Sequence, residues 1–276
     1  GDHRDLHRVD RRQRQMCIRD RLSSGFRAPN IDDVGRVREK AGNVTVPNIT
    51  VTPEFAYNAE IGVQKYFNEK KFRFGANIYY TLLDNYIQRD FVYNPDGSIV
   101  QVAFDGDFGN AVSNQNKRTA YITGVTASYL GRISPIWKTS GFVTYTKGRT
   151  YDSREPMSSI PPIFGQFEMS YVVAEIELGA AIRFNAKKEI SDFNITEGID
   201  NHELTPIVAK NAMDERIKYY GTPSWITMGL NANYTLSNSV SVQARLDNLL
   251  DQHFIEFASG VASPGRNLSL SFRANF

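Results

Sequence analysis

Apolar and polar residues alternate with a period of two along most of the chain. In residues 265–276, GRNLSLSFRANF, leucine, phenylalanine and alanine take every second position from Leu268, and serine, arginine and asparagine lie between them. Such alternation is typical of a strand with one face in an apolar medium and the other in a polar one. The apolar medium can be a second sheet, as in a soluble sandwich, or lipid, as in a membrane barrel.

The same pattern predicts ten strands and therefore an all-β fold. They are residues 22–27, 55–66, 72–89, 119–131, 137–149, 163–173, 176–187, 225–236, 240–248 and 265–276. Segment 137–149 is the least regular, since Phe142 falls among its polar positions. No helical period of comparable strength is present.

The connections between these strands alternate in length without exception. Short turns occupy residues 68–71, 132–136, 174–175 and 237–239, and long loops occupy residues 28–54, 90–118, 150–162, 188–224 and 250–264. A sandwich has no reason to follow this rule, whereas outer-membrane barrels have tight turns at the periplasmic side and long loops outside. The alternation predicts an antiparallel transmembrane β-barrel, with the last strand descending to the periplasmic rim.

Two classes of side chain support a barrel over a soluble all-β fold. Charged residues of the strands fall opposite the apolar stripe: Glu60, Arg73, Glu177, Arg183, Arg245, Asp247 and Arg273. Rings gather near the strand ends: Phe55, Tyr57, Phe72, Phe74, Tyr121, Tyr129, Tyr234 and Phe276. Rings at both ends of spanning strands match the aromatic girdles of membrane barrels.

The composition is compatible with this architecture. Of the 276 residues, 41% are hydrophobic, and no apolar run approaches the roughly 18 residues of a membrane helix. A helical membrane protein is therefore excluded, but a membrane barrel is not, because half of its strand residues are polar.

Residues 1–21, GDHRDLHRVDRRQRQMCIRDR, differ from the remainder. They contain seven arginines, four aspartates and the only cysteine, Cys17, and without them the formal net charge of +2 becomes −1. A basic arm of this kind suits nucleic acid or anionic lipid. MCIRDR, however, resembles a translated sequencing adapter, so segment 1–21 is interpreted as foreign or disordered and residues 22–276 as the barrel portion. We therefore expect no nucleic-acid partner.

Three motifs resemble the C-terminal half of the barrel of TonB-dependent outer-membrane receptors. They are the FRAP box, the TPE at the start of a strand, and an ending of the form DNL…GR…F. The FRAP box is Phe26, Arg27, Ala28 and Pro29; TPE is residues 52–54; the ending comprises residues 247–249, 265–266 and Phe276. The resemblance runs from about Leu22 to Phe276, in family order.

The resemblance implies a barrel of about twenty-two strands with a plugged lumen, of which this chain would be about ten C-terminal strands without the plug. It places the protein in the outer membrane of a Gram-negative bacterium, surrounded by lipid. It implies contact with the TonB complex through the missing plug. Phe276 would be the signal read by the barrel-assembly machinery.

The implied function is TonB-energised uptake of a scarce small-molecule nutrient, such as a ferric siderophore or cobalamin. Aromatic and arginine side chains in the long loops are the candidate ligand contacts, because they suit an iron chelate or a sugar ring. They are Phe91, Tyr93, Phe104, Phe108, Arg149, Tyr151, Arg154, Phe193, Tyr219 and Tyr220. The alternative for each ring is that it packs one loop against another.

Other functions find less support in the residues. His202 and Glu203 lack the second histidine of a zinc helix, and the aspartates are too scattered for calcium, so we expect no metal site, no cofactor and no enzyme activity. Haem is not supported, since no histidine lies near residues 47–52. His253 near Asp251 leaves one alternative open: a self-contained ten-stranded barrel acting as a protease, an adhesin or a passive pore.

Overall fold

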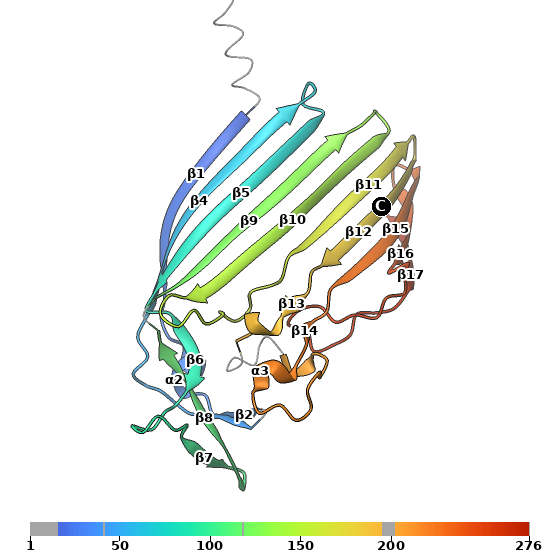
Figure 1. Cartoon of the computed structure of the whole chain (residues 1–276). Coiled ribbons are helices and arrows are strands. Elements are labelled where there is room, and N and C mark those ends of the chain that lie inside the picture. The colour runs from blue at the N-terminus through green and yellow to red at the C-terminus, as the bar shows by residue number, and fades with distance from the viewer. Residues whose placement is uncertain (1–15, 41, 118, 195–201, 276) are drawn as a thin grey trace, which may run out of the picture.

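The computed structural model describes residues 16–40, 42–117, 119–194 and 202–275. Ten strands form one antiparallel sheet, in which each strand pairs with the next long strand of the chain (Figure 1). In sheet order these are β1 (Met16–Arg27), β4 (Glu54–Phe67), β5 (Phe72–Asp84), β9 (Thr119–Arg132), β10 (Trp137–Thr150), β11 (Phe164–Val173), β12 (Ile176–Asn185), β15 (Trp225–Ser237), β16 (Val240–Asp247) and β17 (Asn267–Ala274). β1 and β17 are the two edges of this sheet.

The ten predicted strands and the alternation of turns and loops are confirmed. Two boundaries differ by more than a few residues. β5 ends at Asp84, because Asn85 takes a left-handed conformation with φ of 57° and the chain turns away into the separate strand β6 (Ile87–Phe91). β1 begins six residues before the predicted start at Leu22.

Met16–Arg21, which the sequence analysis left outside the barrel, thus belongs to β1. Within it, Arg21 pairs with Glu60 in the register and Asp20 with Ile61. Asp20 is therefore a carboxylate on the apolar face of the sheet, a position that is unfavourable in a membrane barrel. The foreign origin of segment 1–21 stays a prediction, and residues 1–15 lie outside the described part of the chain.

The register gives the sheet one apolar and one polar face. On the apolar face, Ile61, Ile78 and Val125 lie opposite one another in β4, β5 and β9. Polar side chains of β11, β12, β15, β16 and β17 line a single cavity on the other face, so the sheet curves with its polar face concave. The charged strand residues therefore lie on the concave face, opposite the apolar stripe, as the alternation predicted.

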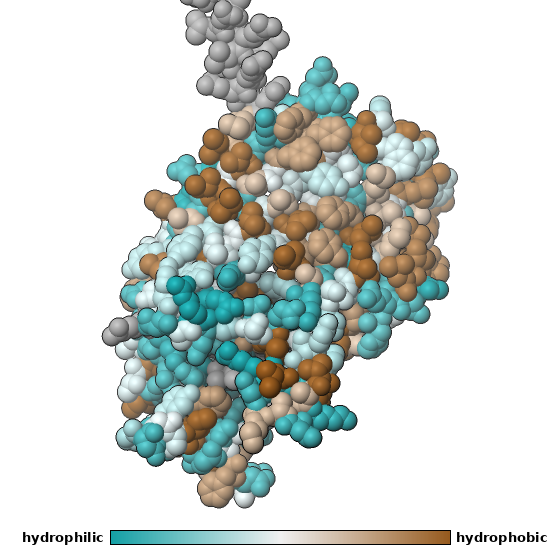
Figure 2. Space-filling model, in the orientation of Figure 1, coloured by the Kyte–Doolittle hydropathy of each residue, from teal (hydrophilic) through white to brown (hydrophobic). Residues whose placement is uncertain are grey.

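The apolar face has no partner within the described chain. Leu22 is 84% exposed, and Ile61 and Ile78 are each 58% exposed. A cluster of buried apolar residues lies elsewhere, where Met157 of a loop packs on Leu83 and Ala120 at the rim of the concave side. Apolar side chains thus cover much of the visible face of the sheet (Figure 2).

Phe142 lies on the concave face, as its position in the pattern predicts. It stands between Ser128 of β9 and Gln166 of β11 in the register. Its ring meets that of Phe164 edge to face, with the centroids 6.1 Å apart. The two rings therefore bury each other on an otherwise polar surface, which explains the irregular pattern of β10.

A second sheet of five strands lies in the loops, where no period in the sequence predicts it. Its members are β2 (Arg38–Lys40), β3 (Asn43–Thr45), β6, β7 (Gln101–Phe104) and β8 (Asp107–Asn116). β3 and β8 pair in parallel, so two loops that are far apart in the sequence form one layer. Val44 and Val112, 1% and 2% exposed, form its small core. This layer lies beyond the loop ends of β1, β4 and β5 (Figure 1).

The remaining elements are short. They are α2 (Ile31–Gly35), α3 (Glu215–Lys218), β13 (Lys188–Glu189), β14 (Gly221–Thr222) and two 3₁₀ turns, Ile190–Asp192 and His202–Leu204. Within the described ranges, no helix has the length and apolar character needed to cross a membrane.

Gly141 of β10 makes room for a row of stacked rings on the apolar face. The rings of Phe74, Tyr129, Phe167 and Phe184 follow one another with centroids 6.0–6.2 Å apart. A Cβ atom at Gly141 would stand 2.5 Å from the ring of Phe167 and 2.7 Å from that of Tyr129. The glycine is therefore required by packing.

We expect Gly141→Ala to destabilise the sheet by about 1–3 kcal/mol, the usual cost of overpacking. The measurement is the heat-induced mobility shift of the receptor containing this chain in a denaturing gel. Gly25→Ala is the matched control, because nothing lies within 4 Å of a Cβ at that position. Equal shifts for the two variants would contradict the assigned role of Gly141.

Candidate functional site

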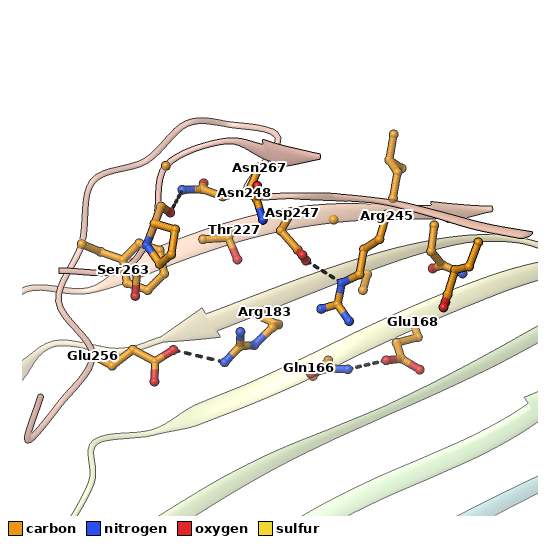
Figure 3. A pocket seen from close by; sticks show the side chains of 18 residues that line it. Gln166, Glu168, Arg183, Thr227, Arg245, Asp247, Asn248, Glu256, Ser263 and Asn267 are labelled. Atoms are coloured by element: carbon orange, nitrogen blue, oxygen red, sulfur yellow. Dashed lines mark hydrogen bonds and ion pairs between the residues drawn. The ribbon is translucent and has the colours of Figure 1, made fainter. Parts of the chain in front are cut away.

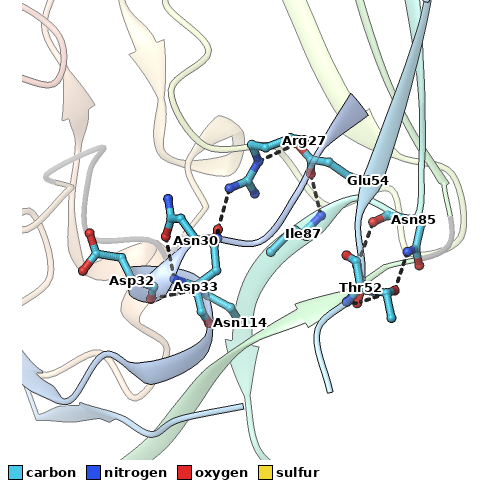
Figure 4. A network of polar contacts seen from close by, with 10 residues as sticks. Arg27, Asn30, Asp32, Asp33, Thr52, Glu54, Asn85, Ile87 and Asn114 are labelled. Carbon is cyan, nitrogen blue, oxygen red and sulfur yellow. Dashed lines mark hydrogen bonds and ion pairs between the residues drawn. The ribbon is translucent and has the colours of Figure 1, made fainter. Parts of the chain in front are cut away.

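The FRAP and TPE motifs meet at the loop end of β1 and β4 (Figure 4). Arg27 donates from Nε to Oε1 of Glu54 at 2.8 Å and from Nη1 to Oδ2 of Asp33 at 2.7 Å. The other Glu54 oxygen accepts a hydrogen bond from the backbone N–H of Ile87. One guanidinium thus joins two strands and the helix α2, which a lysine lacks the planar fork to do.

Two further contacts complete this junction. Asn30 caps α2, because its Oδ1 accepts from the N–H of Asp33 while the Asp33 carboxylate accepts from the N–H of Asn30. On the other side, Asn116 donates to the carbonyls of Thr52 and Asn85, both at 2.9 Å. The motifs therefore fix the bases of the loops that carry the five-stranded sheet.

Three of the predicted ligand residues lie in that sheet, and a fourth, Tyr93, follows β6 in an isolated bridge to Ile99. Phe91 and Tyr93 contact each other edge to face at 6.4 Å. Burial, followed by the nearby carboxylates of Asp90 and Glu155, raises the pKa of Tyr93. Phe104 is half-buried at the end of β7, while Phe108 is 77% exposed. The sheet thus presents the rings of Tyr93 and Phe108 and partly covers the other two.

The next group of predicted residues has partners on the rim, and one of them, Arg149, lies in β10 and not in a loop. Arg149 forms an ion pair with Asp192 and donates to the carbonyl oxygen of Arg154. The hydroxyl of Tyr151 is hydrogen-bonded to that of Tyr80, and its ring contacts Tyr121 at 5.2 Å. The side chain of Arg154 is exposed.

The third group divides into a buried and an exposed part. Phe193 is fully buried and packs edge to face on Phe257 at 6.1 Å. The ammonium of Lys188, also buried, lies over both rings, 4.7 and 4.0 Å from their centroids, and donates to the carbonyl of Ile160 at 2.7 Å. Three loops therefore meet at Lys188, and contact between Phe193 and a ligand would require them to open.

Tyr219 and Tyr220 lie at the edge of this cluster. Tyr219 contacts His202 edge to face, with ring centroids 5.4 Å apart. Tyr220 is 42% exposed and carries the ammonium of Lys187 3.8 Å above its ring. The hydrogen bond to Glu189, more than the weaker contribution of Tyr220, raises the pKa of Lys187. Tyr220 is thus the accessible ring of the pair.

One ion pair joins loops from opposite parts of the chain. Lys40 Nζ lies 2.7 Å from Oε1 of Glu203. Partial burial is the largest single influence and acts to raise the pKa of Glu203, but the hydrogen bond and charge of Lys40, a backbone hydrogen bond and the nearby His202 together outweigh it, so the pKa is lowered. Glu203 therefore serves as a contact between two loops.

The concave face holds a polar cavity of about 560 Å³ that the sequence analysis did not delimit (Figure 3). Arg183 pairs with Glu256 at 3.2 Å, and Arg245 with Asp247 at 2.9 Å. Alternation placed Arg183, Arg245 and Asp247 on this face, but Glu256 comes from a loop and carries no periodic signal. Charges of both signs give the cavity no single preference for anions or cations.

A second, more apolar cavity of about 340 Å³ adjoins the first between two loops. Pro206 and Pro223 line one side, and His253, Phe254 and Ile255 line the other. Phe254 lines both cavities and stacks on Trp225 with ring centroids 4.2 Å apart. Neither ring was among the candidate contacts, because Trp225 opens a predicted strand and nothing in the sequence indicates that Phe254 stacks on it.

Within the described ranges, no group of three or more histidine, cysteine, aspartate or glutamate side chains is placed to hold a metal ion.

The FRAP residues Phe26, Ala28 and Pro29 flank the Arg27 junction. The ring of Phe26 lies 6.3 Å from that of Phe55 on the apolar face. Phe276 lies outside the described residues.

Residues 15–249 match the family model described as "TonB dependent receptor-like, beta-barrel". The chain belongs to this family of TonB-dependent receptors. The predicted family is thereby confirmed, and it is a family of transport receptors, not of enzymes. A search of the curated proteins finds no match.

Solved structures show the same fold at low sequence identity. The copper transporter OprC aligns with a TM-score of 0.71 at 17% identity, over 95% of this chain and 37% of its own. A ferric enterobactin receptor of Pseudomonas aeruginosa, PfeA, gives 0.68 at 17%, over 95% and 38%. The siderophore receptor PirA of Acinetobacter baumannii gives 0.68 at 16%, over 95% and 39%. The chain thus spans less than two fifths of these proteins.

The Arg27 junction generates a prediction. In Arg27→Lys, one ammonium replaces the fork that bridges Glu54 and Asp33, so one carboxylate loses its partner. We expect amide hydrogen exchange in α2 and at Ile87 to accelerate about tenfold, equivalent to about 1.4 kcal/mol. Arg183→Lys is the control, since Arg183 forms a single ion pair. Unchanged exchange around α2 would contradict the bridging role.

The buried ring of Phe193 generates another prediction. We expect Phe193→Ala to destabilise the loop cluster by about 3–5 kcal/mol, because it leaves a cavity under three loops. Limited proteolysis should then cut residues 188–194 and 252–258 faster, while the sheet stays intact. Phe108→Ala, at an exposed ring, should leave both segments as resistant as in the parent. Equal resistance of the two variants would show that Phe193 does not hold the loops.

Proposed function

We propose that this chain is the C-terminal part of the barrel of an outer-membrane receptor that imports a scarce nutrient with energy from TonB. Its substrate class is a ferric siderophore, cobalamin or a similar small molecule. The observation that carries the proposal is the arrangement of the loops: they form a layer with exposed rings at the end of a concave, polar wall. Such a wall is suited to enclose a lumen, and its apolar face is suited to lipid.

The candidate ligand contacts are the exposed side chains of this layer. Tyr93, Phe108, Tyr151 and Tyr220 present ring surface, and Arg154 presents a guanidinium. A flat aromatic face and a cation suit the catecholate or other anionic groups of an iron chelate. The proteins of similar structure include a ferric enterobactin receptor, a pyoverdine receptor and a copper transporter, and the first two ligands agree with this chemistry.

The partners follow from the same proposal. Lipid surrounds the apolar face, the barrel-assembly machinery acts on the C-terminal strand, and TonB acts through a plug carried by another part of the receptor. Strands β1 and β17 form the two edges of the sheet. Both lie within the described residues, and they do not pair with each other. This arrangement disfavours the alternative of a self-contained ten-stranded protease, adhesin or pore, because an open edge in lipid leaves backbone groups without hydrogen bonds.

The proposal is tested by uptake into cells. The complete receptor that contains this chain is expressed in a strain without its own siderophore and cobalamin receptors. Uptake is measured with ⁵⁵Fe-labelled enterobactin and pyoverdine and with labelled cobalamin. We expect uptake of at least one probe, abolished when the TonB gene is deleted. Entry that persists without TonB would contradict energised import.

A substitution locates the ligand. Tyr220→Ala should weaken binding of the transported probe about tenfold, the effect of losing one aromatic contact of about 1–2 kcal/mol. The matched control is Phe67→Ala, since Phe67 is equally exposed, at 41%, at the turn end of β4. Equal affinities of the two variants would remove Tyr220 from the site.

A further inference from the structure

The wall of the sheet has a notch at its loop end, between β10 and β11. β10 continues to Thr150, whereas β11 begins at Phe164, which pairs with Thr144. The last six residues of β10 therefore project beyond their neighbour on this side. Among the described residues, a short return of the chain supplies backbone hydrogen bonds there: Met157 donates to the carbonyl of Gly148 at 3.1 Å and Thr150 donates to that of Glu155 at 3.0 Å. A cavity of about 230 Å³ remains beside the projecting strand.

Basic side chains dominate this cavity. Lys147, Arg149, Lys187 and Lys188 line it, against a single carboxylate, that of Asp192. Asp192 neutralises Arg149, and Lys187 is 2.8 Å from Glu189 at the edge. Lys147 is exposed and forms no ion pair with any described residue. The notch thus keeps an excess of positive charge, and Lys147 is the cation in it that is free for an external anion.

Lys147 stands on the apolar face of the sheet, not on the concave side. In the register it pairs with Thr123, which pairs with Tyr80. Two residues further from the loops, Tyr145, Val125 and Ile78 form the next outward row. Lys147 therefore marks the level at which the apolar surface ends and the charged rim begins.

The surface that leads to the notch is apolar. Pro161, Pro162 and Ile163 form the cavity wall, and the exposed rings of Phe167 and Tyr145 lie on the strands below. Figure 2 shows apolar side chains over the strands and hydrophilic side chains gathered where the strands reach the loops. An amphiphile with apolar chains and an anionic head would match both parts at once.

We propose that the notch binds a phosphorylated lipid of the outer leaflet, with its phosphate at Lys147 and its acyl chains along the apolar face of β10–β12. The inference rests on the proposed membrane placement, which puts the loop end of the strands at the outer surface. A phosphate suits the exposed ammonium of Lys147 within the positive excess of the notch, since an ammonium binds phosphate as a point charge. The apolar wall can bury acyl chains, which a lipid has and free phosphate lacks, so it favours a lipid.

Native mass spectrometry of the complete receptor, stripped of lipid in a non-ionic detergent, tests the proposal. The probes are bis-phosphorylated lipid A, the same lipid after enzymatic dephosphorylation, and inorganic phosphate. We expect the phosphorylated lipid to bind at least tenfold more tightly than its dephosphorylated form, and inorganic phosphate to leave it bound. Equal binding of the two lipids would overturn the site. Displacement by equimolar inorganic phosphate would show an anion site without lipid specificity and would overturn it as well.

Variants at Lys147 assign the preference to the notch. Lys147→Gln should weaken binding of the phosphorylated lipid about fivefold, as expected for about 1 kcal/mol per basic residue at an anionic surface, and Lys147→Glu more strongly. The matched controls are Lys65→Gln and Lys65→Glu, because Lys65 is also exposed on the apolar face but at the turn end of β4. Equal losses at the two positions, or no loss at Lys147, would overturn the assignment.

Nutrient uptake separates this inference from the proposed function. Lys147→Gln should import the labelled nutrient as the parent does, because Lys147 is outside the candidate ligand contacts. Loss of the lipid preference in the parent, with uptake intact, would reject the lipid site alone. Uptake that does not require TonB, with the lipid preference intact, would reject the import function alone.

Discussion

The backbone hydrogen bonds between neighbouring strands are the constraint on which the rest of this structure depends. In lipid, a peptide group without a partner costs several kcal/mol, so each spanning strand must pair on both sides or lie at an edge that another strand covers. The pairing fixes the register, and the register decides which side chains face the lumen. A shift of one residue would turn every apolar side chain of a strand inward. The polar cavity, the aromatic rows and the notch all follow from this one alignment.

The strands could be predicted because successive side chains of a paired strand face opposite media, which gives the sequence a period of two. All ten were found, and even the irregular position of Phe142 was informative, since its ring does face the concave side. The limits were less predictable. Alternation can continue through a bend, as at Asn85, where a left-handed residue ends β5 and the sequence still reads as strand. In the first half of β1, Asp20 interrupts the apolar positions Met16, Ile18 and Leu22, and the pairing with β4 defines Met16–Arg21 as strand.

The loops could not be read in this way. β2 and β3 have three residues each, too few for a period, and the parallel pair β3–β8 joins segments that only the fold brings together. Composition correctly placed aromatic residues in the loops, but it does not distinguish Phe193, fully buried under Lys188, from Tyr220, whose ring is accessible. That difference depends on Phe257 and Ile160 from two other loops. The FRAP and TPE motifs were recognised as family features, and their joint role at Arg27 became visible only when Glu54, Asp33 and Ile87 were placed around it.

The parallel pairing of β3 with β8 has a consequence for biogenesis. The two strands come from loops on either side of the β4–β5 hairpin, so their layer forms only after that hairpin is in place. Pairing over so long a sequence separation is slow, because the loop-closure entropy must be overcome first. If the strands insert into a membrane, both loops must cross it as unfolded chain and assemble on the far side. The five-stranded sheet would then form last, and its formation would require that both loops have been translocated.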